Sequence, residues 1–287
     1  AAQLASLRGP DKGPGSSAGP HHRRPSGSER GGWERHITWL VSLIGVVALR
    51  VRRPVVAGSF YAGTEEALRK QIEWCFNHEL GPGGVPEPRD GPLEGLVALV
   101  CPHAGYMYSG PVAAHSYARL AEAGRPGTAI ILGPNHTGMG SAVAVWPDGS
   151  WRTPLGELQV DVEAAEAIVE RAEIASFDEG AHAFEHSIEV QLPFLQFLYG
   201  QEVRIVPICM MFQDARTAEE VGMAIAGAVE ELGLNAILIA STDLTHYEPY
   251  EVAKKKDLAV VEAIMSLDVP GLYRAVEELP VTMCGYG

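Results

Sequence analysis

Residues 96–106 of this 287-residue chain read LVALVCPHAGY, a short apolar run that ends in a turn-forming loop carrying His103. Two later stretches repeat the pattern: residues 129–136, AIILGPNH, end at His136, and residues 237–246, ILIASTDLTH, end at His246. Such a run bounded by turn formers is typical of a strand buried on both faces, as in parallel sheets. The carboxyl ends of parallel strands meet at one edge, where ligands bind. We therefore expect three imidazoles to gather at one sheet edge.

The rest of the chain alternates between strand and helix patterns. This alternation predicts an α/β fold, a three-layer α/β/α sandwich around a mostly parallel central sheet. Residues 142–146 and 150–153, on either side of a Pro-Asp-Gly turn, predict a hairpin. Pro193 predicts a kink in a helix over residues 185–199. We expect the other helices at residues 64–77, 110–123, 161–172, 217–232, 250–267 and 269–279, and a further strand at 203–209.

The amino-terminal part of the chain has a different composition. Residues 1–32 are rich in Gly, Pro, Ser and Arg, and they hold too little apolar surface to order themselves. The apolar run at residues 37–49 is shorter than the roughly 20 residues that a bilayer span needs. It also lacks a signal-peptide cleavage motif. We therefore expect residues 1–50 to be a disordered or non-domain segment, and residues 51–287 to form one α/β domain.

Charge and cysteine usage limit the classes of function. Residues 54–287 carry 13 basic and 33 acidic side chains, so this part would repel a phosphate backbone, and nucleic acid is not an expected partner. A membrane is not an expected partner either. The four cysteines include no CxxC pair and form no disulfide framework, which is the pattern of reduced thiols in a cytoplasmic protein.

His103 and His136 stand in similar loops, and together they predict a metal site. Neutral imidazole binds Zn, Fe and Cu equally well, so these two residues leave the metal open. His246 follows Asp243 by three residues, which predicts an acid–base pair in which the carboxylate orients the imidazole. The alternative is that Asp243 or Thr245 caps the next helix.

Two further groups are open to more than one interpretation. His186 and Glu189 are spaced to share one helical face, where they would supply a ligand or a partner to a ligand, or else form a buried ion pair. Cys284, in a short turn, is either a thiolate ligand for a borderline metal or a small buried residue.

Several motifs together resemble the Memo family, which includes protein B of the AmmeMemoRadiSam system. The resemblance extends from about residue 53 to residue 287, with the motifs in order. It implies a fold similar to that of class III extradiol dioxygenases, which are non-haem iron enzymes. The motifs are VAGSFY at residues 56–61, PHAGY at 102–106 followed by Ser109-Gly110, GPNH at 133–136, RTPLG at 152–156, EHSIE at 185–189 and STDLTH at 241–246.

The resemblance also implies roles for individual residues. His103, His136 and Cys284 would bind the metal, and His246, with Asp243, would occupy the acid–base position. A cysteine in place of the dioxygenase carboxylate argues against ring cleavage, because thiolate changes the charge and redox behaviour of the metal. The chain ends soon after Cys284, without the family's last helix and strands, so we expect a carboxyl-terminally truncated domain. The residues expected beside the ligands or in a substrate pocket are His186, Glu189 and Tyr106.

The function implied is that of a cytoplasmic redox protein with one Fe or Cu ion. Its expected partners are a radical-SAM protein and a third AmmeMemoRadiSam component, and its substrate would be a small molecule or a peptide. One alternative is an adaptor that binds a peptide or phosphopeptide in the same pocket without catalysis. A weaker alternative is Zn-dependent hydrolysis with His246 as the base.

Overall fold

A computed structural model of the chain describes residues 50–287, so the expectations for residues 1–49 lie outside the described residues. No helix in the described range is long and apolar enough to cross a membrane. The strands are β1 (Val51–Arg52), β2 (Ala98–Cys101), β3 (Thr128–Pro134), β4 (Val143–Val145), β5 (Ser150–Thr153), β6 (Gly156–Gln159), β7 (Ala175–Phe177), β8 (Arg204–Met210) and β9 (Ala236–Ser241). The α-helices are α2 (Glu65–Asn77), α3 (Tyr106–Ala123), α4 (Val162–Arg171), α5 (Leu192–Tyr199), α6 (Ala215–Leu232), α7 (Tyr250–Met265) and α8 (Val269–Glu278).

The three sequence stretches that end in histidine loops form neighbouring strands. The central sheet has the strand order β2-β9-β3-β8-β4-β7. The pairs β2–β9, β9–β3 and β3–β8 are parallel, whereas β4 runs antiparallel to β8 and parallel to β7. A mostly parallel sheet was predicted, and it is confirmed. A smaller sheet, in the order β1-β5-β6, lies beside it.

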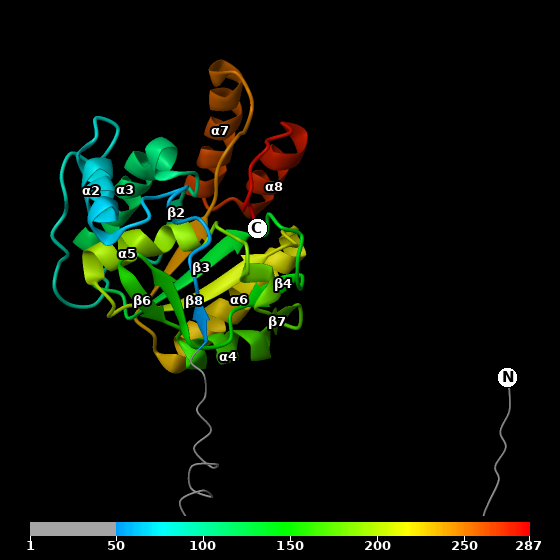
Figure 1. Cartoon of the computed structure of the whole chain (residues 1–287). Helices are drawn as coiled ribbons and strands as arrows, with labels where there is room; N and C mark the ends of the chain where they lie inside the picture. Colours follow the sequence, from blue (N-terminus) through cyan, green and yellow to red (C-terminus); the bar gives the residue numbers. More distant parts are fainter. Residues whose placement is uncertain (1–49) are drawn as a thin grey trace, which may run out of the picture. The chain divides into compact units, whose positions relative to one another are not determined.

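Alternate residues of the central strands face two helix layers. Ile131 on β3 belongs to the core cluster that contains Leu120 of α3, while the adjacent Ile130 belongs to the cluster that contains Ile168 of α4. All four side chains are buried, because successive side chains of a strand point to opposite faces. Figure 1 shows α2, α3 and α5 on one side of the sheet and α4 and α6 on the other. This is the predicted three-layer α/β/α sandwich.

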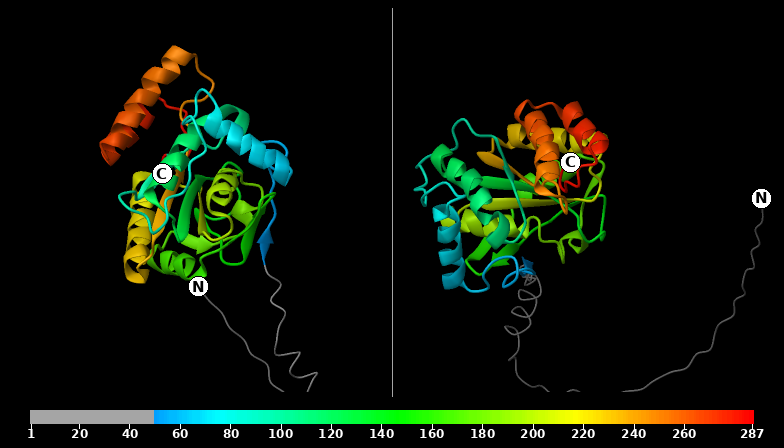
Figure 2. Two further views of the ribbon diagram at one scale, coloured as in Figure 1. Left: turned by 90° about the vertical axis from the view of Figure 1, so that its left-hand side faces the viewer. Right: turned by 90° about the horizontal axis from the view of Figure 1, so that it is seen from above.

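Helices α7 and α8 pack mainly against each other. Their own cluster contains Val260, Val281 and Met283 as its buried members, and α8 has no buried residue. Figure 2 shows the two helices together at one end of the domain. This helix pair leads the chain back to the sheet, where Cys284 bridges to Asp243 just after β9.

The predicted hairpin at residues 142–146 and 150–153 is wrong. Strand β4 lies between β8 and β7 in the central sheet, so both of its edges are occupied. The turn at residues 147–149 leads instead into the small sheet, where β5 pairs with β1 and β6. Trp146 and Trp151 then meet edge to face across this junction, with ring centroids 5.6 Å apart.

Two helix predictions also need correction. Residues 183–188 are not helical, and α5 begins only at Leu192, so Pro193 lies at the start of the helix and makes no kink. Proline suits this position because the first turn needs no backbone N–H donor. Helix α3 begins at Tyr106, four residues before the predicted start. Thr64 caps α2, since its side chain accepts a hydrogen bond from the Ala67 N–H.

Candidate metal centre

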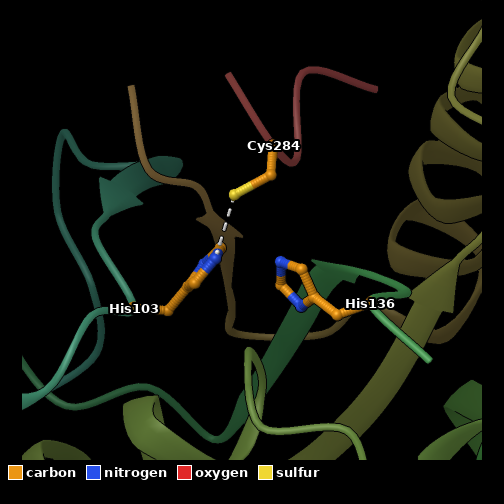
Figure 3. A group of neighbouring side chains, drawn as sticks. All are labelled: His103, His136 and Cys284. Carbon is orange, nitrogen blue, oxygen red and sulfur yellow. Dashed lines mark hydrogen bonds between the residues drawn. The ribbon is translucent and has the colours of Figure 1, made fainter. Parts of the chain in front are cut away.

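Three side chains from distant parts of the chain converge at the carboxyl edge of the central sheet. His103 follows β2, His136 follows β3, and Cys284 comes from the segment after α8. Each offers a ligand atom, and these atoms lie within 4.8 Å of one another. Figure 3 shows the three side chains pointing into one space, with His103 Nε2 only 3.1 Å from the Cys284 sulfur. The predicted gathering of histidines at this edge is therefore observed for His103 and His136.

The hydrogen bonds around Ser241 determine which nitrogen of His103 carries the proton. The Ser241 hydroxyl donates to the Ser187 carbonyl (2.7 Å) and accepts from the Gln191 amide (2.8 Å). Its proton is thus already used, so it accepts from His103 Nδ1–H at 3.0 Å. Nε2 then presents a lone pair toward Cys284, as a metal ligand requires.

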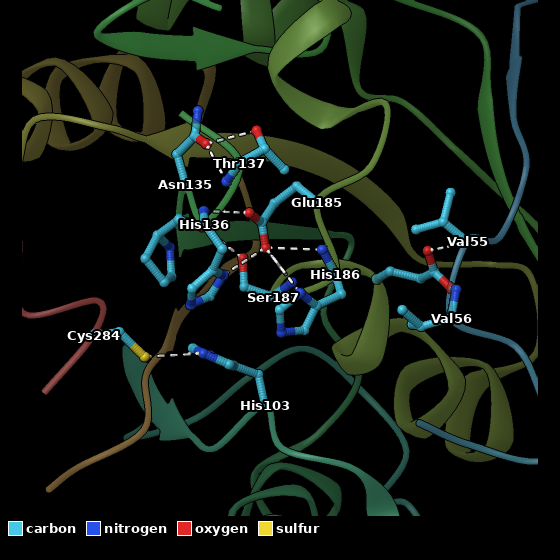
Figure 4. Close-up of polar contacts among 12 residues, drawn as sticks. Val55, Val56, His103, Asn135, His136, Thr137, Glu185, His186, Ser187 and Cys284 are labelled. Carbon is cyan, nitrogen blue, oxygen red and sulfur yellow. Dashed lines mark hydrogen bonds and ion pairs between the residues drawn. The ribbon is translucent and has the colours of Figure 1, made fainter. Parts of the chain in front are cut away.

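Glu185 orients His136 in the same way. Its carboxylate accepts from the His136 ring Nδ1–H (2.9 Å) and from the His136 backbone N–H (2.6 Å), so Nε2 is the nitrogen that faces Cys284 (Figure 4). The backbone N–H groups of His186 and Ser187 donate to the same carboxylate. Glu185 is 1 % exposed. Burial alone would raise the Glu185 pKa, but the hydrogen bonds from His136 and Ser187 outweigh it and lower the pKa to about 2.

Cys284 is held beside the histidines by its backbone. Its N–H donates to the Asp243 carbonyl (3.1 Å), and its own carbonyl accepts from the Thr242 hydroxyl. Burial opposes ionisation of the thiol, yet its polar contacts with the His103 and His136 rings lower the Cys284 pKa to about 6. Hydrogen bonds to Cys284 and Glu185 raise the His136 pKa to about 10. Both shifts favour the ion pair of a Cys284 thiolate and a His136 imidazolium.

The donor set suits a metal ion with borderline or soft character. Two imidazole nitrogens and a thiolate suit Zn, Cu or Fe, whereas Mg and Ca prefer oxygen ligands. Around a tetrahedral ion with bonds of about 2.0–2.3 Å, ligand atoms lie about 3.3–3.8 Å apart. The three ligand atoms lie within 4.8 Å of one another, with 3.1 Å between His103 Nε2 and the Cys284 sulfur, which is close to that spacing. The residues therefore fit one bound ion.

Asp243 and His246 lie at the same edge but do not form the predicted pair. The Asp243 carboxylate accepts from the His103 backbone N–H (2.9 Å), and His246 Nδ1–H donates to the Thr282 carbonyl (2.7 Å). The loop also opens no helix here, because Tyr247 has a left-handed φ of 59° and α7 begins at Tyr250. Asp243, His246 and Cys284 nevertheless offer ligand atoms within 4.8 Å of one another. His246 thus borders the centre with its Nε2 available.

Among the residues expected beside the ligands, His186 alone lies against them. Its ring stacks on His136 with centroids 4.7 Å apart and contacts Phe60 at 4.6 Å. Burial lowers the His186 pKa, which favours the neutral form of the ring. His136, Glu185 and His186 also form a potential ligand group of their own.

Glu189 and Tyr106 lie deeper in the domain. The shared helical face predicted for His186 and Glu189 does not form, because the short helix there begins only at Glu189. Glu189 instead pairs with Arg52, so the alternative of a buried ion pair between His186 and Glu189 is also wrong. Tyr106 is a core residue whose hydroxyl donates to the Val190 carbonyl at 2.7 Å.

Sequence reasoning did not identify Glu185 or Ser241 as partners of the ligands. Each stands in a quoted motif within two residues of a residue singled out from the sequence, but neither has a periodicity or spacing that predicts its contact. Glu185 lies 49 residues from His136, and Ser241 lies 138 residues from His103. The available signal was chemical: a ligand histidine needs an acceptor for its second nitrogen.

Comparison with known proteins identifies the family of the chain. The sequence model of the family described as Memo-like protein matches residues 52–287. A MEMO1 family protein of Methanopyrus kandleri is 58% identical over 236 residues, covering 82% of this chain and 83% of the relative. Another, from Methanothermobacter thermautotrophicus, is 50% identical over 237 residues, covering 83% of this chain and 84% of the relative. The chain therefore belongs to the Memo-like protein family.

Proposed function

We propose that the chain binds one iron or copper ion through His103, His136 and Cys284 and serves in an oxidation that uses dioxygen. The observation that carries the proposal is the matched orientation of the two histidines. Ser241 and Glu185 each accept an Nδ1–H, so both Nε2 atoms point at the same thiolate. A redox ion in such a donor set supplies electron transfer and activation of dioxygen.

The protein's own residues would prepare and serve the site. Glu185 and Ser241 hold the ligand rings in place before an ion arrives, which limits the reorganisation on binding. His246 Nε2, free of protein partners in the described part of the chain, would accept or donate a proton at the open side. The rings of His186 and Phe60, which contact each other, would offer a surface for a small-molecule or peptide substrate.

The proposal includes partners of the AmmeMemoRadiSam type, a radical-SAM protein and a third component. Its support is family membership together with an open metal edge, since a redox centre at a sheet edge is reachable by an electron donor. Zinc-dependent hydrolysis would use the same ligands with His246 as base. Peptide binding without metal would use the same pocket.

Metal content is the measurement that separates these functions. The protein should be purified without oxygen, together with His136→Ala, Cys284→Ser and the control His115→Ala. His115 is an exposed histidine on α3, where it bonds the Leu80 carbonyl away from the site. We expect about one Fe or Cu per chain in the wild type and the control, and none in the two ligand variants.

Other results would contradict the proposal in different ways. One Zn per chain, with no consumption of oxygen on addition of a reductant, would favour hydrolysis. No metal in any sample, even after anaerobic reconstitution with Fe²⁺ or Cu⁺, would favour peptide binding. Metal retained by Cys284→Ser would exclude the thiolate from the ligand set.

A further inference from the structure

We propose that a buried ion pair, Arg52 with Glu189, positions both ligand histidines through the turn at residues 182–187. The inference rests on the proposed function, because it assigns a positioning role for the metal ligands. Arg52 is 4 % exposed and Glu189 is fully buried. Neither side chain belongs to the metal-ligand groups of the described residues, and the pair joins positions 137 residues apart.

The Arg52 guanidinium binds the backbone carbonyls at both ends of the segment 182–185. Its Nε and Nη2 each donate to the His182 carbonyl at 3.2 Å, and Nη2 also donates to the Glu185 carbonyl. Nη1 donates to Glu189. The guanidinium lies over the Trp151 ring, 4.3 Å from its centroid. One planar group therefore ties the 182–185 backbone to the small sheet.

The Glu189 carboxylate holds the loop of residues 55–61 on the other side of the ion pair. In addition to Arg52, its carboxylate accepts from the backbone N–H groups of Val55 (2.9 Å) and Val56 (3.1 Å) and from the Tyr61 hydroxyl (2.6 Å). These donors begin and end the loop that carries Phe60, whose ring contacts His186. Figure 4 shows Val55 and Val56 on the side of the site away from Cys284. The pair thus connects two loops that border the metal centre.

Both ligand histidines depend on the turn that Arg52 holds. Glu185, whose backbone Arg52 binds, directs His136 through two hydrogen bonds. Ser187, two residues later, offers its carbonyl to Ser241, the residue that directs His103. The Ser187 hydroxyl also donates to the Pro134 carbonyl at the end of β3, at 3.0 Å. A displaced turn would therefore misdirect both Nε2 atoms.

The chemistry of the pair favours positioning over packing. A buried ion pair gains little stability over apolar residues of similar volume. Stability therefore does not explain why the chain buries this pair. Arginine offers a rigid planar fork that binds two carbonyls and a carboxylate at once, whereas a lysine ammonium is a single point donor. All three nitrogens of the Arg52 guanidinium donate hydrogen bonds here.

The test compares metal affinity with global stability in two variants. Arg52→Lys retains the positive charge opposite Glu189 but cannot reach both carbonyls. The double variant Arg52→Met with Glu189→Gln removes both charges together, so no unpaired charge remains buried. The control is Thr128→Val, which removes a buried hydrogen bond to Asp161 at the amino end of β3, opposite the metal edge. Affinity for Co²⁺ would be measured by chelator competition, and its visible spectrum recorded, with Tm measured in parallel.

We expect Co²⁺ to bind about 10–100-fold more weakly to both variants, with an altered ligand-field spectrum. The control should lose Tm but keep wild-type affinity. A second readout needs no metal: the His136 ring Nδ1–H, hydrogen-bonded to buried Glu185, should give a slowly exchanging downfield proton signal that broadens in both variants.

Affinity within about twofold of wild type together with an unchanged ring signal would overturn the inference. An equal loss of affinity in Thr128→Val would also overturn it, since the effect would then be one of general stability. If the wild type itself binds no Co²⁺, Fe²⁺ or Cu⁺, the proposed function fails. The ring signal then decides the positioning role by itself.

Discussion

The metal centre joins two regions of the molecule that differ in how firmly they are packed. His103 and His136 follow central strands whose faces lie in the two large core clusters. Cys284 follows α8, and the helix pair before it shares a cluster with three buried members. Since local stability depends on buried apolar contacts, we infer that the histidines are placed by the core, while the cysteine completes the site from a less stable segment.

The cysteine is nevertheless directed to the site by specific contacts. Its backbone bridges to Asp243, and Thr242 donates to its carbonyl, both from the residues just after β9. The sheet thus supplies the docking edge even for the ligand that it does not carry. Because one ligand follows the less stable helix pair, we expect metal binding and ordering of α7 and α8 to be coupled.

The largest expected contrast is in stability. Leu120→Ala, in the core on α3, should lower the free energy of unfolding by about 2–5 kcal/mol, because it leaves a cavity. Leu272→Ala, half-buried on α8, should lower it by about 1 kcal/mol or less. Urea denaturation followed by circular dichroism measures both. Equal losses would mean that the two regions unfold as one unit of similar packing.

The second contrast is the pH dependence of metal affinity. The His136 pKa is raised to about 10, so below that pH a metal must displace its proton. The Cys284 pKa is lowered to about 6, so above that pH the thiolate is already present. Affinity should therefore rise about tenfold per pH unit between pH 6.5 and 8.5, with one proton released.

Chelator competition for Co²⁺ at several pH values measures this slope. Glu185→Gln removes one of the groups that raise the His136 pKa, so its slope should be shallower in the upper part of the range. A flat profile in the wild type would show that His136 is already neutral in the metal-free protein.

The third expected effect is on backbone exchange. Metal should slow amide hydrogen exchange in α7, α8 and residues 281–287 by about tenfold or more, because Cys284 becomes fixed to the sheet. Amides of β3, β8 and β9 should change little, since they are already buried. Mass spectrometry of peptides from the metal-free and loaded protein compares the two regions directly. If metal slowed exchange only in the strands, the central sheet rather than the helix pair would be the less stable region.

The smallest expected effect concerns His246. Its ring is held by the Thr282 carbonyl and borders the centre without belonging to the three-ligand group that contains both sheet-borne histidines. His246→Ala should change metal affinity by less than about threefold, below the usual effect of losing even a partner of a ligand. A loss as large as that of Cys284→Ser would instead make His246 a ligand, together with Asp243.

Local sequence patterns were sufficient for the layered fold and for the placement of two ligands. Apolar runs such as residues 129–132 predict a buried strand from side-chain burial and length alone. Strand β3 continues through Gly133 and Pro134, and His136 stands just beyond its end. The same logic failed at residues 142–153. The turn there was recognised, but which edge each strand pairs with depends on strands far along the chain.

The tertiary structure alone decided which groups control the ligands. Glu185 reads in the sequence as an ordinary charged residue, and its role exists only because the turn at 182–187 lies against the loop after β3. Arg52 and Glu189 meet across 137 residues. Periodicity and turn chemistry act over a few residues, so the sequence shows them directly. Buried polar partners are selected by satisfying hydrogen bonds after the chain has closed, and those pairings are visible only in the folded molecule.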